Sequence, residues 1–249
     1  MEIWQLIILF CASFLMSILS GITGAGSGFI ITPLMIALGM TPAQAVSTGK
    51  IGGILIPIGS LGGLRKSKEK VARNKIIAIM ILALVIGLIA PFVIKTLDNS
   101  VYRIILGIIL LLMIPVMILK KVGVHSYQPN NKQKTIGTIL LSFALLLQGI
   151  FSGGLGSLVN IVLMSMLGMN ATEANITKRW SQLILNITVI FGVISSGLIL
   201  WYVAIVMIPA SLGGAYIGGH IAVKKGNKFV MNVLIGLMAI SALYLIFWR

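Results

Sequence analysis

Ten apolar runs, separated by short polar connections, occupy almost all of this 249-residue sequence. They cover residues 3–20, 26–40, 43–64, 74–97, 101–119, 136–150, 154–169, 172–195, 201–223 and 229–248. Crossing the hydrocarbon core of a bilayer takes about 20 apolar residues of α-helix. A helix also pairs its own backbone N–H and C=O groups, which lipid cannot do. The runs therefore predict an all-α integral membrane protein, with one membrane domain over residues 1–249.

The composition supports a surface that faces lipid. Of the residues, 58% are hydrophobic and 9% are charged, whereas soluble domains carry about 25% charged residues. So few polar side chains cannot cover a water-facing surface. The first run has no positive stretch before it and no clear cleavage site after it, so we expect a retained helix and no cleaved signal peptide.

The 19 Lys and Arg residues far outnumber the four Asp and Glu residues, and most of them occupy three short connections. These are Arg65, Lys66, Lys68, Lys70, Arg73 and Lys75 in the first loop, Lys120, Lys121, Lys132 and Lys134 in the second, and Lys224, Lys225 and Lys228 in the third. Cations in short loops between apolar spans indicate the cytoplasmic side. A nucleic-acid-binding protein would instead place them along one soluble surface, so we expect no nucleic-acid partner.

The positions of the basic loops are mutually consistent. They follow the third, fifth and ninth runs, and an even number of crossings separates each loop from the next. All three loops can then be cytoplasmic, with both termini outside. We therefore expect a multi-pass protein of the cytoplasmic membrane of a prokaryote.

Two of the runs are short, and each follows a glycine-rich stretch. The stretches cover residues 21–28 and 149–156. The runs after them have about 16 residues, roughly 24 Å as helix against a hydrocarbon core of about 30 Å. Irregular backbone at membrane depth is tolerated only where protein or a water-filled cavity pairs its polar groups. The pattern predicts discontinuous helices after both breaks.

The two glycine-rich regions also repeat each other, at an offset of 128 and then 129 residues. The matching pairs are Gly21 and Gly149, Ile22 and Ile150, Gly26 and Gly154, Gly28 and Gly156, Leu38-Gly39-Met40 and Leu167-Gly168-Met169, Ala45 and Ala174, and Thr48 and Thr177, with Lys50 opposite Arg179. We assign one repeat to about residues 1–120, a basic loop to 120–134 and a second repeat to about 135–249. Five crossings in each half would invert one half relative to the other, a common plan for transporters.

These features resemble the sulfite exporter TauE/SafE family of membrane transporters. The likeness rests on the first glycine stretch, on the segments that follow it, Phe29-Ile30-Ile31-Thr32-Pro33-Leu34 and Gly39-Met40-Thr41-Pro42-Ala43-Gln44-Ala45, and on the second copy over residues 149–174. The resemblance implies a polytopic inner-membrane carrier for small anions, often sulfur-containing, such as sulfite, organosulfonates, sulfoacetate or related organic acids. The sequence departs from the family at Ala25, Ser27, Phe151 and Leu155, which leaves the identity of the substrate open.

The breaks themselves are candidate binding elements. Backbone N–H groups and the helix dipole favour an anion at a helix start, and glycine allows close approach of the backbone. The candidates here are Gly24, Gly26, Ser27, Gly28, Gly153, Gly154 and Gly156. Tight helix packing is the alternative, because Gly24 and Gly28 are also spaced as GxxxG. The following helices are expected to be capped by Thr41 and by Asn170, with Thr172 as a rival cap.

Side chains after the breaks complete the candidate site. Lys50 and Arg179 each lie about two turns into their segments and could attract a substrate; the alternative is an interface anchor, above all for the neighbouring Lys178. Polar candidates on the same segments are Ser47, Thr48, Asn175, Thr177, Gln182 and Asn186, and the repeat partners Thr32 and Asn160 are weaker additions. Hydrogen bonds between helices would explain this polar stripe equally well.

The sequence therefore favours a transporter of small, sulfur-containing anions that works by alternating access. An anion channel and a transporter of non-sulfur organic acids are the alternatives. The histidines and acids are scattered, so we expect no catalytic residues, no metal site and no cofactor. The expected partners are the anion and the lipid bilayer, and the sequence leaves homo-oligomerisation open.

Overall fold

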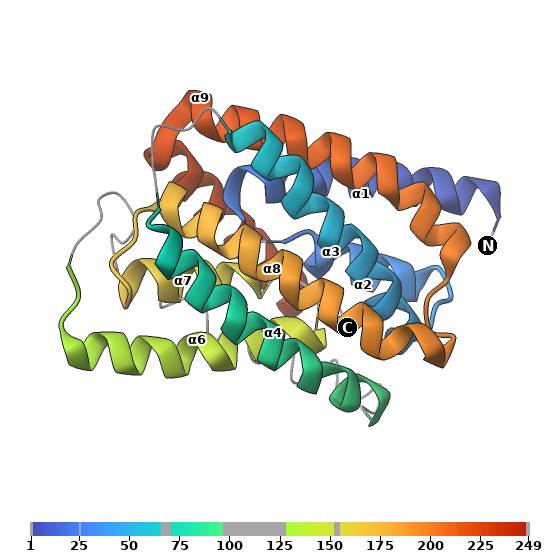
Figure 1. Ribbon diagram of the computed structural model, residues 1–249. Coiled ribbons are helices and arrows are strands. Elements are labelled where there is room, and N and C mark those ends of the chain that lie inside the picture. Colours follow the sequence, from blue (N-terminus) through green and yellow to red (C-terminus); the bar gives the residue numbers. More distant parts are fainter. Residues whose placement is uncertain (1, 25, 66–70, 97–127, 152–154, 248–249) are drawn as a thin grey trace.

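In the computed structural model, the described residues are 2–24, 26–65, 71–96, 128–151 and 155–247, and every regular element within them is a helix (Figure 1). The α-helices are α1 (Ile3–Thr23), α2 (Gly28–Ala37), α3 (Pro42–Leu64), α4 (Arg73–Thr96), α6 (Asn131–Phe151), α7 (Gly156–Ser165), α8 (Ala171–Val193) and α9 (Trp201–Phe247), with a 3₁₀ turn η1 (Ile194–Ser196). The predicted segment 101–119 lies outside the described residues. The all-α prediction is confirmed for the described part of the chain.

Five of these helices are long and apolar enough to cross a membrane: α1, α3, α6, residues Arg73–Ile94 of α4 and residues Trp201–Gly226 of α9. The chain is therefore a multi-pass membrane protein. Helix α8 is equally long, but it carries Glu173, Lys178 and Arg179. Large apolar side chains on the outer faces of α4 and α9, such as Phe92 (73% exposed) and Ile205 (63% exposed), provide a surface suited to lipid.

The two short helices have ten residues each, about 15 Å at 1.5 Å per residue. They are shorter than the predicted runs 26–40 and 154–169, because glycines in the left-handed region end them: Gly39 has a φ of 97° and Gly168 a φ of 71°. Glycine with left-handed backbone commonly follows the end of a helix, because it has no Cβ that would clash in that conformation. The prediction of short, interrupted segments is confirmed, with corrected bounds.

The helices that follow the short ones begin in the same way. Thr41 accepts a hydrogen bond from the Gln44 N–H (3.3 Å), and its own N–H donates to the Gln44 side chain (3.1 Å). Asn170 and Glu173 form the same reciprocal pair, with both distances 2.9 Å. Each is a capping box, which pairs N–H groups that a helix start leaves free. The predicted caps Thr41 and Asn170 are confirmed, and the rival cap Thr172 was wrong.

Helices that correspond in the two predicted repeats run in opposite directions. In Figure 1, α1 runs from right to left and α6 from left to right, and the same opposition holds for α3 and α8. The end of α3, the starts of α4 and α6 and the bend of α9 all lie at the left-hand end, opposite the N-terminus. Basic residues at these positions, including Arg65, Arg73, Lys132 and Lys225, therefore lie at one end of the molecule. That this end is cytoplasmic stays a prediction.

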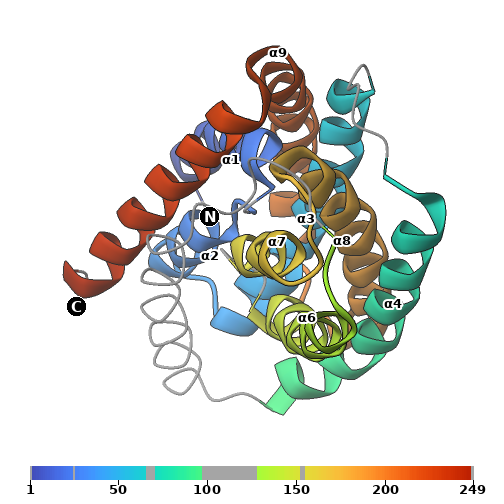
Figure 2. The ribbon, with the colours of Figure 1, turned by 90° about the vertical axis from the view of Figure 1, so that its left-hand side faces the viewer.

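The first leg of α9 packs closely against both α1 and α3. A Cβ on Gly218 would lie against the Ile18 carbonyl and 2.9 Å from the Gly21 Cα in α1. On α3, a Cβ on Gly219 would lie 2.5 Å from the Ser60 carbonyl oxygen. Small residues allow helix backbones in lipid to approach in this way. Figure 2 views the molecule from its left-hand side, along many of these helices.

We expect Gly218→Ala to destabilise the protein and Gly213→Ala, on the same helix, to leave stability unchanged or raised. The new methyl group at position 218 would overpack backbone, at a cost of about 1–3 kcal/mol. At position 213 it would lie 3.7 Å from the Phe14 ring, an ordinary contact. The measurement is the midpoint of thermal unfolding in detergent, and equal midpoints for the two variants would contradict the packing argument.

Candidate functional site

The first glycine-rich stretch interrupts the helix, as the sequence predicted. Helix α1 ends at Thr23, and Gly24 (φ 73°) and Gly26 (φ 93°) both have left-handed backbone before α2 begins at Gly28. In the second stretch, α6 ends at Phe151 and α7 begins at Gly156. The predicted site residues Gly153 and Gly154 lie outside the described residues.

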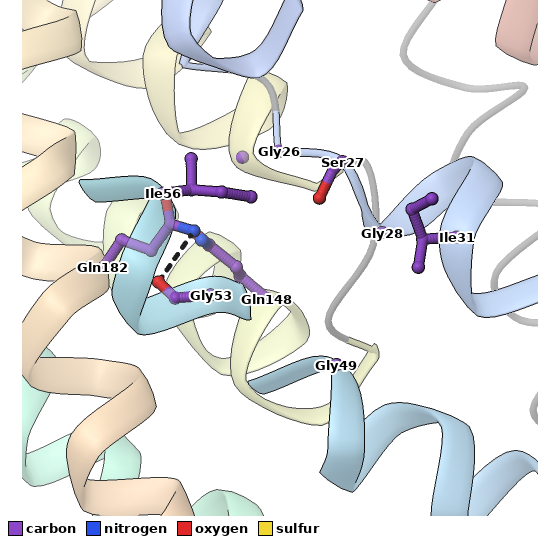
Figure 3. A pocket seen from close by; sticks show the side chains of 10 residues that line it. Gly26, Ser27, Gly28, Ile31, Gly49, Gly53, Ile56, Gln148 and Gln182 are labelled. Carbon is purple, nitrogen blue, oxygen red and sulfur yellow. Dashed lines mark hydrogen bonds between the residues drawn. The ribbon is translucent and has the colours of Figure 1, made fainter. Parts of the chain in front are cut away.

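The starts of the two short helices meet at one small cavity (Figure 3). Its volume is about 20 Å³, enough for about one water molecule. The lining residues are Gly26, Ser27, Gly28, Ile31, Gly49, Gly53, Ile56, Gln148, Gly156 and Gln182. Five predicted site residues are therefore brought together here: Gly26, Ser27, Gly28, Gly156 and Gln182.

The helix starts provide hydrogen-bond donors at this cavity. The first N–H groups of a helix have no partner within it, and the dipole adds about half a positive charge. Neither N-cap residue, Ser27 of α2 nor Leu155 of α7, makes a side-chain capping bond. The side chains of these N-cap residues therefore do not bind the first backbone N–H groups of α2 and α7.

Three cations near the cavity are fully buried: Lys50 on α3 and Lys178 and Arg179 on α8, each 0% exposed. The interpretation of these residues as interface anchors is therefore wrong, because an anchor reaches water. The acids of the described residues, Glu2 and Glu173, are engaged in capping boxes at the starts of α1 and α8. Within the described residues, no salt-bridge partner accompanies the three cations.

The buried cations bind backbone carbonyls at the ends of helices. The Lys50 Nζ atom donates to the Gln148 carbonyl, 2.9 Å away, in the last turn of α6. The Arg179 guanidinium donates to the Ser20 carbonyl and, at 3.2 Å, to the Gly21 carbonyl near the end of α1. The last carbonyls of a helix lack intrahelical partners and carry about half a negative charge. A cation is well placed at such an end.

These two contacts cross between the halves in matching positions. Lys50 and Arg179 are counterparts in the repeat, and Ser20 and Gln148 are separated by the same 128 residues as Gly21 and Gly149. Each predicted repeat therefore contributes the cation that binds the last turn of the other repeat's first helix.

The end of α1 receives further donors from α7 and α8. The Asn175 amide donates to the Ile22 carbonyl (2.9 Å), and the Asn160 amide donates to the Thr23 carbonyl (2.7 Å). A Cβ on Gly24 would lie 2.7 Å from both amides. Asn175, Arg179 and Gly24 were predicted to bind substrate, but in this arrangement they fix the end of α1 and do not line the cavity.

The paired threonines also lie away from the cavity. The Thr48 hydroxyl accepts a hydrogen bond of 3.0 Å from the Leu200 N–H, at the start of α9. Thr177 is buried, and its hydroxyl has no hydrogen-bond partner among the described residues. Thr48 thus caps a helix start, and Thr177 makes no described polar contact.

Lys178 connects the end of α1 to the cavity. Its Nζ atom donates to the Gly24 carbonyl and, at 2.5 Å, to the Gln182 side-chain oxygen. The Gln182 amide nitrogen in turn lies 3.4 Å from the Gly53 carbonyl oxygen, as the dashed line in Figure 3 marks. Gln182 is therefore held at both ends of its amide while it lines the cavity.

The Gly53 carbonyl is free for these contacts because of a proline. Pro57 lies inside α3, and it has no N–H to donate to the carbonyl four residues earlier. Asn186 on α8 provides the missing donor, with its amide nitrogen 2.9 Å from the Gly53 oxygen. A structural hydrogen bond between helices therefore accounts for Asn186.

Sequence reasoning missed Gln148 and gave little weight to Lys178. Gln148 is the only glutamine in the apolar run 136–150 and directly precedes Gly149, which is a signal that could have identified it. Lys178 could not be distinguished from an interface anchor, because its partner outside α8 is the Gly24 backbone carbonyl, which leaves no mark in the sequence. Among the described residues, no group of three or more His, Cys, Asp or Glu side chains is placed to hold a metal ion.

We expect Asn186→Ala to destabilise the protein, and to do so less when Pro57→Ala is also present. The single change leaves the buried Gly53 carbonyl with one long contact, at a cost of about 1–3 kcal/mol. Alanine at position 57 restores a helical N–H for that carbonyl. A double-mutant cycle of unfolding free energies in detergent should give a coupling of about 1 kcal/mol, and equal losses in both backgrounds would refute the proline argument.

Comparison with known proteins identifies related chains. A family model for the sulfite exporter TauE/SafE matches residues 9–245. A probable membrane transporter protein of Haemophilus influenzae is 27% identical over 234 residues, which cover 92% of this chain and 90% of that protein. The probable membrane transporter proteins YfcA of Escherichia coli K12 (22% over 254 residues; 96% and 89% covered) and YjnA of Bacillus subtilis (24% over 242 residues; 92% and 94% covered) are also similar. No solved structure matches the chain.

Proposed function

Because this chain belongs to the sulfite exporter TauE/SafE family, we propose that it transports a small, sulfur-containing anion across the membrane by alternating access. Sulfite, an organosulfonate or a sulfoacetate-like compound is the proposed substrate. Transport is the proposed activity because the relatives are named probable membrane transporter proteins.

The observation that carries the proposal is the buried positive charge around the cavity. Lys50 follows the cavity-lining Gly49 in the chain, Lys178 binds the cavity-lining Gln182, and Arg179 is adjacent to Lys178. The two helix ends that accept their hydrogen bonds carry about half a negative charge each. Roughly two positive charges therefore remain uncompensated by the described residues.

Uncompensated charge of this kind favours an anionic ligand. A cation at the centre of a bilayer costs about 2.5–3.5 kcal/mol on insertion scales, and a bound anion would offset part of this cost. The starts of α2 and α7 add further positive potential and N–H donors at the cavity. A cation or a neutral solute would gain nothing from this field.

Alternating access is supported by the arrangement of the halves. Opposed helix directions, crossed cation contacts and two ten-residue helices agree with the proposed five-plus-five inverted repeat. Binding sites between such repeats are formed by discontinuous helices. The cavity has room for about one water molecule, and a sulfur oxyanion is larger than water, so the helices around it would have to move during transport. The basic end would face the cytoplasm and the N-terminus the opposite side.

The test is counterflow in proteoliposomes that contain the purified protein and unlabelled sulfite, sulfoacetate, sulfate or acetate. We expect transient accumulation of the matching labelled sulfur anion, because a carrier exchanges substrate faster than it equilibrates it. Uptake without saturation or counterflow would indicate the alternative, an anion channel. Counterflow of acetate without any sulfur anion would instead favour the second alternative, a carrier of other organic acids.

We expect Lys50→Met and Arg179→Met each to lower the rate of counterflow by about ten- to hundredfold. Both changes remove positive potential near the cavity and release a helix end from its cation, and a hydrogen bond to a charged group contributes about 1.5–3 kcal/mol. Lys132→Met is the matched control, because Lys132 is exposed in the first turn of α6. Wild-type rates in both buried-site variants would refute the role of these cations.

A further inference from the structure

One side chain at the cavity has hydrogen-bonding capacity that the described protein does not use. Gln148, in the last turn of α6, is 4% exposed and lines the cavity. Its side-chain oxygen is buried and has no hydrogen-bond partner among the described residues. Buried amides are normally paired, because an unpaired one costs about 1–3 kcal/mol.

The backbone of Gln148 is held firmly even though its amide is not. Lys50 donates to the Gln148 carbonyl at 2.9 Å, so a buried cation of the first half fixes the residue that presents the amide. This anchoring sets where the side chain starts. The amide oxygen has no described partner to hold it, so a half-turn about the terminal bond, a broad and roughly two-fold torsion, can present the amide N–H groups to the cavity. The arrangement is that of a positioned ligand group.

Gln182 provides the contrast across the same cavity. Its amide oxygen accepts from Lys178 and its nitrogen faces the Gly53 carbonyl, so both ends are occupied by protein. In Figure 3 the side chains of Gln148 and Gln182 point towards each other from α6 and α8. Of these two glutamines, Gln148 is the one whose amide oxygen has no described protein partner.

We propose that Gln148 is a substrate ligand and a specificity-determining residue, which donates its amide N–H to an oxygen of the transported sulfur oxyanion while Lys50 positions it. This inference rests on the proposed function. A neutral amide beside helix N–H groups can bind the oxygens of a sulfite or sulfonate group without adding charge. The amide N–H and the helix N–H groups all donate hydrogen bonds, and the oxygens of an oxyanion accept them.

A structural role for Gln148 predicts a different result from a ligand role. If the amide served stability, an apolar residue of similar size would lower the stability of the protein. If the amide serves the substrate, Gln148→Leu removes an unpaired buried polar group and stability stays the same or rises. Measuring stability and transport together therefore separates the two roles.

The experiment compares wild-type protein with Gln148→Leu and Gln148→Glu in proteoliposomes, using labelled sulfite and sulfoacetate. For Gln148→Leu we expect the apparent KM of the transported anion to rise about ten- to hundredfold, with an unfolding midpoint no lower than that of wild type. For Gln148→Glu we expect loss of counterflow, because a carboxylate in the cavity repels the anion.

Gln133→Glu is the matched control on the same helix. Gln133 lies in the first turn of α6, where its side chain accepts from the Asn130 N–H at 3.0 Å, and glutamate serves equally well there. We expect its KM and rate to match wild type. A KM within twofold of wild type for Gln148→Leu, or a fall in its unfolding midpoint, would overturn the ligand role while leaving the proposed function intact. Absence of sulfite and sulfoacetate counterflow in the wild-type protein would overturn the proposed function, and the ligand role with it.

Discussion

The arrangement of this protein depends on buried cations that bind the carbonyl ends of interrupted helices. Helices that stop inside a membrane leave carbonyl groups that lipid cannot pair. Arg179 and Lys178 satisfy the end of α1, and Lys50 satisfies the end of α6. Without these donors the chain could not place helix breaks, and hence the starts of α2 and α7, at a common cavity.

The same contacts join the halves in a way that ordinary packing would not. Apolar side chains between helices in lipid gain little from burial, since the surroundings are equally apolar. Hydrogen bonds from α3 to α6 and from α8 to α1 are directional and specify one alignment. The glycine contacts of α9 with α1 and α3 then bring backbones close enough to enclose these polar groups.

Sequence patterns predicted the helical class, the interruption within residues 21–28, the caps Thr41 and Asn170 and the grouping of basic residues at one end. These features follow from local chemistry, such as hydropathy, glycine content and the spacing of capping residues. The partners of Lys50 and Arg179 could not be predicted, because a backbone carbonyl leaves no mark in the sequence. The lengths of α2 and α7 also escaped prediction, since φ at Gly39 and Gly168 decides where those helices end.

Helix α8 has a consequence for how the chain enters the membrane during synthesis. It carries two adjacent cations that bind carbonyls of α1, and inserting both alone would cost about 5–7 kcal/mol. Helix α1 is translated long before α8, so its carbonyl end is already present when α8 emerges from the ribosome. For Lys50 the order is reversed, because it is translated 98 residues before its partner Gln148. The first half must therefore hold one unpartnered cation until the second half is made, and this delay defines the vulnerable period of biogenesis.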